Sequence, residues 1–69
     1  MANLTLIKLP VVLEKTAISR SSMNRAIERG DFPKPIRLNP NGRAVAWVEA
    51  EVDEWIQQRI EASRQQGAA

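Results

Sequence analysis

The stretch of sequence that decides the fold is TAISRSSMNRAIERG, residues 16–30. Ser19 is a favourable helix N-cap, and Gly30 is a favourable residue just past the end of a helix. Between them Met23, Ala26 and Ile27 recur at i, i+3 and i+4, which draws one apolar stripe. The sequence therefore predicts a short helix over residues 20–29 with one buried face.

The opposite face of this helix is polar and net basic. At about 100° per residue, the face and its flanks carry Ser21, Ser22, Asn24, Arg25, Glu28 and Arg29. Side chains of these types contact phosphates and base edges. A preceding short helix and a tight turn at residues 16–19 complete a helix-turn-helix pattern. We therefore interpret the helix of residues 20–29 as the recognition helix of a DNA-binding protein.

Size and composition limit the chain to one small domain and argue against catalysis. The 69 residues include no cysteine and no histidine, so disulfides, the familiar nucleophile–base pairs and most transition-metal sites are absent. There is no Gly-rich phosphate loop, and the carboxylates form no evident acid–base pair. We expect no enzyme activity, no catalytic residue, no metal and no cofactor.

Charge and hydropathy point to a cytoplasmic, nucleoid-associated protein with two unlike surfaces. Residues 1–46 carry eight Lys or Arg and three acids, a net charge of +5. Residues 47–69 carry two Arg and five acids, a net charge of −3. One face is thus suited to an anion and another is not. No apolar run approaches the roughly 18 residues of a membrane span, and no signal-peptide pattern is present.

Shorter elements surround the central helix. Residues 4–9 are compatible with a brief strand or an extended lead-in, and Pro10 suits the start of a helix that runs to about residue 15. Pro33 and Pro35 exclude a helix after Gly30. Residues 36–38 and 44–47 alternate like two strands, and Asn39-Pro40-Asn41-Gly42 between them predicts the turn of a β-hairpin, or wing.

A last helix is expected over residues 49–63. Its buried face is marked by apolar side chains at helical spacing: Val52, Trp55, Ile56 and Ile60. We predict a mainly helical α+β fold, a small winged helix-turn-helix of three helices and a two-stranded hairpin. The domain would span residues 1–63, and residues 64–69 would form a flexible C-terminal tail.

The ordered set of local motifs resembles the AlpA family of small phage-type regulators, which belongs with the excisionase-like winged helix-turn-helix proteins. The resemblance covers roughly residues 4–60. It is carried by residues 9–16 (LPVVLEKT), 18–23 (ISRSSM) and 30–36 (GDFPKPI), followed by Trp47, Glu49, residues 51–52 (EV) and residues 55–56 (WI).

The resemblance implies a recognition helix at residues 21–29 and double-stranded DNA as the ligand. Such proteins are typically carried by prophages and integrative elements, as transcriptional regulators, as excision factors that bend DNA for an integrase, or as both. Family helices often have an aromatic residue where Asn24 stands, which gives this chain an additional polar contact to offer.

Ten residues are candidates for DNA contact. We expect Ser21, Ser22, Asn24 and Arg25 at base edges or nearby phosphates, and Arg20 and Arg29 at phosphates. The full set is Arg20, Ser21, Ser22, Asn24, Arg25, Arg29, Lys34, Arg37, Asn41 and Arg43. Of these, the last four lie on or before the wing and would reach the backbone or a minor groove.

Plainer interpretations stand beside these assignments. Ser21 and Ser22 could simply complete a helix cap, Arg25 could be solvated surface, and basic residues on a hairpin guard edge strands against aggregation. We expect Glu28 to pair with Arg25 rather than to accept a hydrogen bond from a cytosine amine, which is the alternative. The remaining polar and aromatic residues favour structural roles: Trp47 and Trp55 in the core, and the acids of residues 49–53 at the positive end of a helix dipole.

Two functions remain open. The first is a sequence-specific DNA-binding regulator or excision factor, monomeric in solution and assembling cooperatively on repeated sites, with a phage-type integrase as a possible partner. The second is a protein-interaction module whose acidic last helix inhibits or recruits an integrase or a signalling regulator. Replacement of Arg25 and Arg43 by alanine would abolish the first activity and spare the second.

Overall fold

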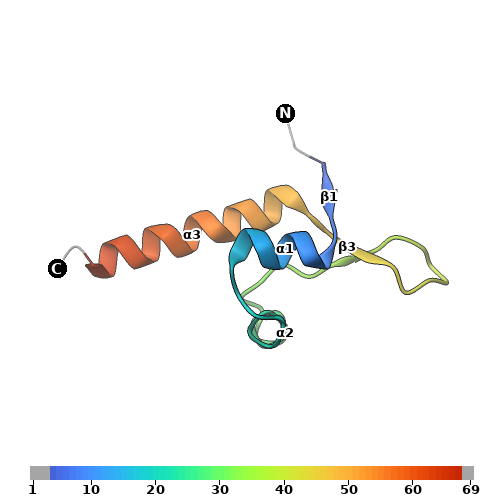
Figure 1. Ribbon diagram of the computed structural model, residues 1–69, viewed down its shortest axis with the longest axis horizontal. Coiled ribbons are helices and arrows are strands. Elements are labelled where there is room, and N and C mark those ends of the chain that lie inside the picture. The colour runs from blue at the N-terminus through green and yellow to red at the C-terminus, as the bar shows by residue number, and fades with distance from the viewer. Residues whose placement is uncertain (1–3, 68–69) are drawn as a thin grey trace.

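The computed structural model describes residues 4–67 and consists of three helices and a small antiparallel sheet (Figure 1). In chain order the elements are β1 (Leu6–Ile7), α1 (Leu9–Thr16), α2 (Arg20–Arg29), β2 (Ile36–Arg37), β3 (Val45–Val48) and α3 (Glu49–Gly67). The predicted mainly helical α+β fold, with three helices and a hairpin, is confirmed.

Helix α2 begins and ends where the sequence predicts. The Ser19 Oγ accepts a hydrogen bond from the Ser22 amide at 3.1 Å, which satisfies one of the free donors of the first turn. At the other end Gly30 adopts φ 81°, and its N–H donates to the carbonyls of Ala26 and Ile27. A left-handed residue here ends a helix without steric cost only if it lacks a side chain.

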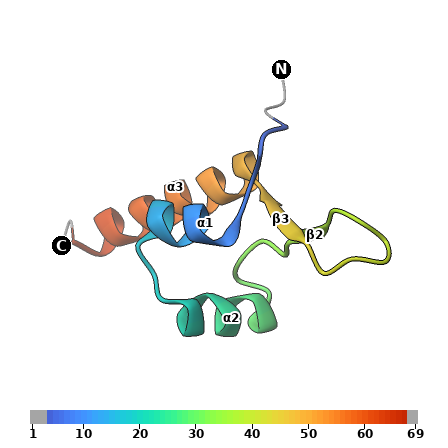
Figure 2. The same cartoon turned by 45° about the vertical axis from the view of Figure 1, so that its right-hand side comes forward.

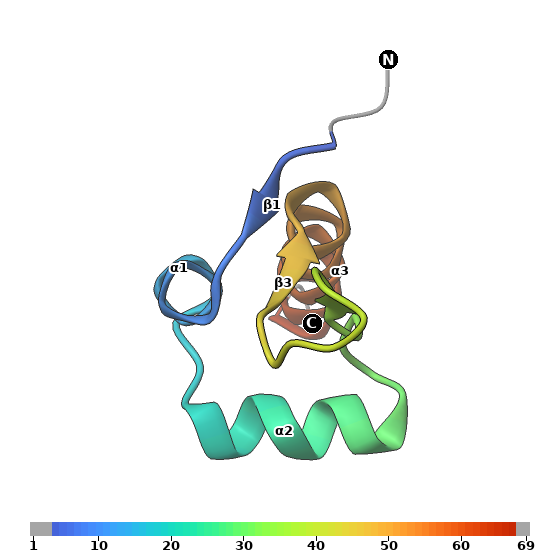
Figure 3. The same cartoon turned by 90° about the vertical axis from the view of Figure 1, so that its right-hand side faces the viewer.

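Helix α1 is one residue longer at each end than predicted. Lys8 precedes it in an extended conformation, and Pro10 lies in its first turn, where a missing N–H costs nothing. The helix ends at Thr16, and the next residue, Ala17, has φ 61° and donates its amide to the Leu13 carbonyl at 2.8 Å. This left-handed residue turns the chain, and α2 then runs across the direction of α1 and α3 (Figure 3).

The sheet has the order β1-β3-β2, with both pairs antiparallel. Strands β2 and β3 form the predicted hairpin, and the segment of residues 36–48 is called the wing below. Strand β1 joins the hairpin as a third strand, a pairing that the sequence did not predict: Leu6 and Ile7 pair with Val48 and Trp47. The Glu49 amide extends this pairing by donating to the Thr5 carbonyl at 2.8 Å.

The core lies between the helices and β3. Its buried members are Ile7, Val12, Met23, Ala26, Phe32, Trp47 and Val52. The Trp47 indole N–H donates to the Pro33 carbonyl at 3.0 Å, which satisfies its polar atom inside the core. Trp55 is partly buried, and its ring meets the Phe32 ring edge-to-face with 4.9 Å between the ring centroids. Trp47 therefore lies inside the core and Trp55 packs against it, as predicted.

Helix α3 is longer than the sequence indicates. It continues through Gly67, so its end does not coincide with the predicted domain boundary at residue 63. Its C-terminal half projects beyond α1 (Figure 1). The prediction that Ile60 is buried is wrong, because this part of the helix has little to pack against and the Ile60 side chain remains 38 % exposed. Of the predicted tail, residues 68–69 lie outside the described residues.

Candidate nucleic-acid interface

Helix α2 forms one edge of the molecule, and the wing extends to one side of it (Figure 2). Met23 and Ala26 hold α2 to the core, with side chains that are 2 % and 7 % exposed. The face that points away from them is thus fixed by the same apolar stripe that the sequence shows. This arrangement places a capped, polar helix where a large ligand can approach it.

All of the predicted contacts on α2 are exposed to solvent: Arg20, Ser21, Ser22, Asn24, Arg25 and Arg29. The N-terminal half of α2 therefore presents hydroxyl, amide and guanidinium groups together. These groups match the donors and acceptors of base edges and the charge of phosphates. Their contact with DNA stays a prediction.

Ser22 has a structural role in the cap. Besides its amide bond to Ser19, its Oγ accepts a hydrogen bond from the Ser19 hydroxyl at 3.0 Å. The plainer interpretation of Ser22, completion of the cap, is thus supported by two hydrogen bonds. Its own hydroxyl proton is still available to donate, because a serine oxygen can accept and donate at once.

The cations of α2 differ in their surroundings. The Arg29 Nε pairs with the Asp31 Oδ2 at 3.1 Å, and both side chains are more than half exposed. The expected pair of Arg25 with Glu28 is wrong: across residues 4–67 neither side chain enters an ion pair. Within the same range Arg20 also has no ion-pair partner, so two guanidinium groups near the start of α2 are uncommitted.

The wing and the segment before it carry the remaining predicted contacts, and all of them are exposed. Lys34 lies between α2 and β2, Arg37 ends β2, and Asn41 and Arg43 lie in the loop before β3. The loop closes through a bond from the Gly42 amide to the Asn39 carbonyl at 3.2 Å. A side-chain carbon at Gly42 would come 3.2 Å from the Asn39 Cβ, so the turn favours glycine there.

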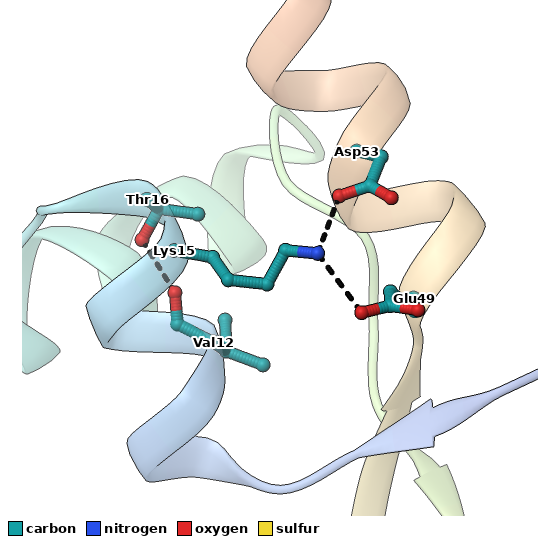
Figure 4. Close-up of polar contacts among 5 residues, drawn as sticks. All are labelled: Val12, Lys15, Thr16, Glu49 and Asp53. Atoms are coloured by element: carbon teal, nitrogen blue, oxygen red, sulfur yellow. Dashed lines mark hydrogen bonds and ion pairs between the residues drawn. The ribbon is translucent and has the colours of Figure 1, made fainter.

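A three-residue cluster that sequence reasoning missed joins α1 to α3 (Figure 4). The Lys15 Nζ lies 2.7 Å from the Asp53 Oδ1 and 3.0 Å from the Glu49 Oε2. Asp53 first, and then Glu49, raise the pKa of Lys15 above its ordinary value of 10.5. The only sequence signal was the i, i+4 spacing of Glu49 and Asp53. That spacing does not identify Lys15, which lies 34 residues before Glu49, as their partner.

Over residues 4–67, His, Cys, Asp and Glu side chains form no group of three or more that could hold a metal ion. The same range contains no helix that is long and apolar enough to cross a membrane.

A capped second helix across the first, a left-handed turn between them and a hairpin beside them define a small winged helix-turn-helix domain. The sequence model of a family described as "Prophage CP4-57 regulatory protein (AlpA)" matches residues 5–60. The chain belongs to this AlpA family, as the resemblance indicated. The family is one of regulatory proteins, which confirms the expectation that the chain is not an enzyme.

Two relatives support the assignment. The chain is 34 % identical over 58 residues to the "DNA-binding transcriptional activator AlpA" of Escherichia coli K12, with 78 % of this chain and 83 % of the relative covered. It is 36 % identical over 61 residues to the "Uncharacterized protein ORF88" of Enterobacteria phage P4, with 88 % and 66 % covered.

Proposed function

We propose that this chain is a sequence-specific, double-stranded DNA-binding protein of a prophage or integrative element. The observation that carries the proposal is the N-terminal half of α2, which exposes Arg20 and Arg25 without ion-pair partners beside Ser21 and Asn24. The described activity of the E. coli relative, DNA-binding transcriptional activation, supports it. A protein with this activity works at the nucleoid.

In the proposed mode of binding, α2 enters the major groove with its N-terminal residues toward the base edges. Arg25 donates both arms of its guanidinium to a guanine, and Asn24 pairs with an adenine. Arg20 and Arg29 contact phosphates, which sets the register of the helix without reading sequence. The wing contacts the backbone or the minor groove, with Arg43 free to extend from its loop.

Alanine variants of Arg25 and Arg43 test this proposal. We expect R25A to weaken binding to a specific site by about 1–3 kcal/mol, because a bidentate base contact is lost. R43A should weaken binding to specific and unrelated sequences alike, because a phosphate contact carries no sequence information. Fluorescence anisotropy with labelled duplexes measures both.

The matched control is Arg64→Ala, which removes an exposed arginine from α3, away from the proposed interface. R64A should bind with nearly the affinity of the wild-type chain. Equal losses in R25A and R64A would contradict groove binding by α2 and would leave only a general effect of net charge.

The choice between transcription control and excision is decided by where the protein binds. Footprinting on DNA flanking its own gene and the adjacent attachment sites gives the answer. Protection over a promoter supports a regulator. Protection of short repeated sites in an attachment region supports an excision factor that bends DNA for an integrase, and protection in both regions supports both roles.

We further propose that the protein is a monomer in solution and assembles cooperatively on repeated sites. Among the described helical residues, the exposed large apolar side chains are Val11 on α1 and Ile60 on α3, so no helix presents a continuous apolar face for a stable dimer. Sedimentation of the free protein tests the monomer. The steepness of binding to duplexes with one site and with two sites tests cooperativity.

A second function, protein interaction through the acidic last helix, is favoured by the exposed acids of α3. Glu51, Glu54 and Glu61 all face solvent, on a helix that would lie away from DNA bound at α2. The double variant R25A/R43A separates the two functions. It should lose DNA binding and keep any interaction made by α3.

A further inference from the structure

An open pocket of about 290 Å³ lies between α3 and the segment that follows α2. Its residues are Gly30, Asp31, Phe32, Pro33, Glu51, Glu54, Trp55 and Gln58. Figure 3 shows α1 on one side of α3 and the segment after α2 on the other. The volume is at the small end of the range for ligand pockets, which suits one long side chain better than a cofactor.

The pocket uses the side of α3 opposite its Lys15 contact, where Trp55 packs against the core. Glu51, Glu54, Trp55 and Gln58 follow the i, i+3, i+4, i+7 spacing of a single helix face. Glu49 and Asp53, which bind Lys15, lie on the other side of the same helix. The acids of α3 therefore divide into a pair that Lys15 neutralises and a pair that opens to solvent.

The carboxylates at the rim lack a cation of their own. Across residues 4–67 Glu51 and Glu54 enter no ion pair, and Glu54 accepts only a long 3.5 Å bond from the Gln58 amide. Asp31, on the opposite wall, is shared with Arg29. The pocket thus concentrates negative charge in a chain whose net charge is +2.

Aromatic rings supply an apolar wall beside these charges. Phe32 is 3 % exposed and meets Trp55 edge-to-face. The Trp55 ring already attracts one guanidinium, because the Arg59 Cζ lies 5.4 Å from the ring centroid. Carboxylates next to aromatic rings form the environment that an arginine prefers, since its stem packs on the rings while its head meets the charges.

We propose that this pocket binds an arginine side chain of a partner protein. The negative rim repels a phosphate, and the described acids form no metal-binding group, so neither a nucleic acid nor a metal ion suits it. Among the chain's own arginines, those of α2 and the wing contact DNA in the proposed function, and Arg59 lies over the Trp55 ring without an ion pair to Glu51 or Glu54. The assignment of the pocket to an arginine of another protein therefore rests on the proposed function. None of the pocket residues is among those proposed to contact DNA, so both ligands can be held together.

The test is an amide and indole NMR titration of the full chain with acetyl-Gly-Arg-Gly-amide, in the absence of DNA. We expect saturable shifts confined to residues 30–33, 51–58 and the Trp55 indole, with a Kd on the order of 1 mM. The same peptide with citrulline in place of arginine has nearly the same shape without charge. It should bind about tenfold more weakly, because charge-assisted hydrogen bonds are lost.

Two variants complete the test. The double variant E51Q/E54Q should also bind the arginine peptide about tenfold more weakly. Glu61→Gln, on the same helix outside the pocket, should bind it like the wild-type chain. Equal binding of both peptides, equal losses in the double variant and E61Q, or shifts spread over all acidic residues would overturn the proposal.

A protein concentration series without peptide tests whether a second copy of the chain occupies the pocket. Shifts at the same pocket residues that grow with protein concentration would show that a second copy fills the pocket, which overturns its assignment to another protein. DNA affinity is measured separately on E51Q/E54Q. Because the peptide titration contains no DNA, a failure of the pocket and a failure of the DNA-binding proposal give different results.

Discussion

Ala17 is the residue on which the helix-turn-helix geometry depends. It has φ 61° and is exposed, so its side chain gains no burial in return for a left-handed backbone that costs an L-residue about 1–2 kcal/mol. We expect Ala17→Gly to raise the free energy of unfolding by up to about 1 kcal/mol, after the larger chain entropy of glycine is subtracted. Urea unfolding followed by circular dichroism measures this change.

The matched control makes the same chemical change at an ordinary helical position. Ala62→Gly, on the exposed part of α3, should lower the free energy of unfolding by about 1 kcal/mol. A loss of stability in both variants would show that the turn does not depend on a left-handed residue 17.

Ser19 acts at the same scale, at the start of the helix that we propose to read DNA. Its side chain accepts the Ser22 amide, so Ser19→Ala should cost about 1 kcal/mol of stability. Ser19→Asp should keep the stability, because a carboxylate accepts the same bond and suits the positive end of the helix dipole. Thermal unfolding of the three proteins checks the order, which an equal loss in both variants would contradict.

Between elements, the Lys15 cluster is the contact with the clearest electrostatic signature. Lys15 lies on α1, and Asp53 and Glu49 lie on α3. The pKa of Lys15 is raised above 10.5 in the folded chain, so the unfolded chain loses the proton first as pH increases. The stabilising contribution is therefore fully present below pH 10.5 and disappears as pH passes the raised pKa.

Lysine-to-methionine variants turn this into a measurement. Lys15→Met should be less stable than the wild-type chain at neutral pH, and the difference should vanish well above pH 10.5. Lys8→Met, an exposed position just before α1, serves as the control and should show no such pH-dependent difference. Urea midpoints at the two pH values test it, and a K15M difference that persists at high pH would assign the effect to packing instead.

The elements differ in how far the sequence alone reveals them. Both ends of helix α2 are predicted correctly because its caps, Ser19 and Gly30, directly flank the helix in the sequence. The pairing of β1 with β3 joins residues 6 and 48, and two residues of strand carry too little pattern to reveal such a partner. Ile60 follows the apolar spacing of α3 but lies where the helix projects beyond α1, a fact that no local pattern contains.

The candidate interface shows the same limit. Helical spacing identifies its exposed face, since burial of Met23 and Ala26 fixes the opposite side. It does not show that Arg29 pairs with Asp31, because this pair depends on where the chain turns after Gly30. The acidic pocket was missed for a similar reason: its walls, residues 30–33 and 51–58, meet only through the fold.

At the scale of the whole molecule, the uneven distribution of charge makes a prediction about salt. The cations that we propose for phosphate contact lie on α2, on the wing and on the segment between them: Arg20, Arg29, Lys34, Arg37 and Arg43. Each phosphate contact in B-DNA releases condensed counterions and contributes about −0.9 to the slope of log affinity against log salt. Five contacts would give a slope of about −4.5.

Variants that each remove one arginine measure how much a single phosphate contact contributes to this slope. Arg43→Ala should make the slope less steep by about 0.9 if the wing contacts one phosphate through this residue. Arg64→Ala changes the net charge equally and should leave the slope unchanged, because α3 lies away from the proposed DNA-binding surface. Affinities measured by anisotropy at four or more salt concentrations give these slopes. A wild-type slope near zero would contradict phosphate contacts on both α2 and the wing, whereas equal changes in R43A and R64A would show that only net charge matters.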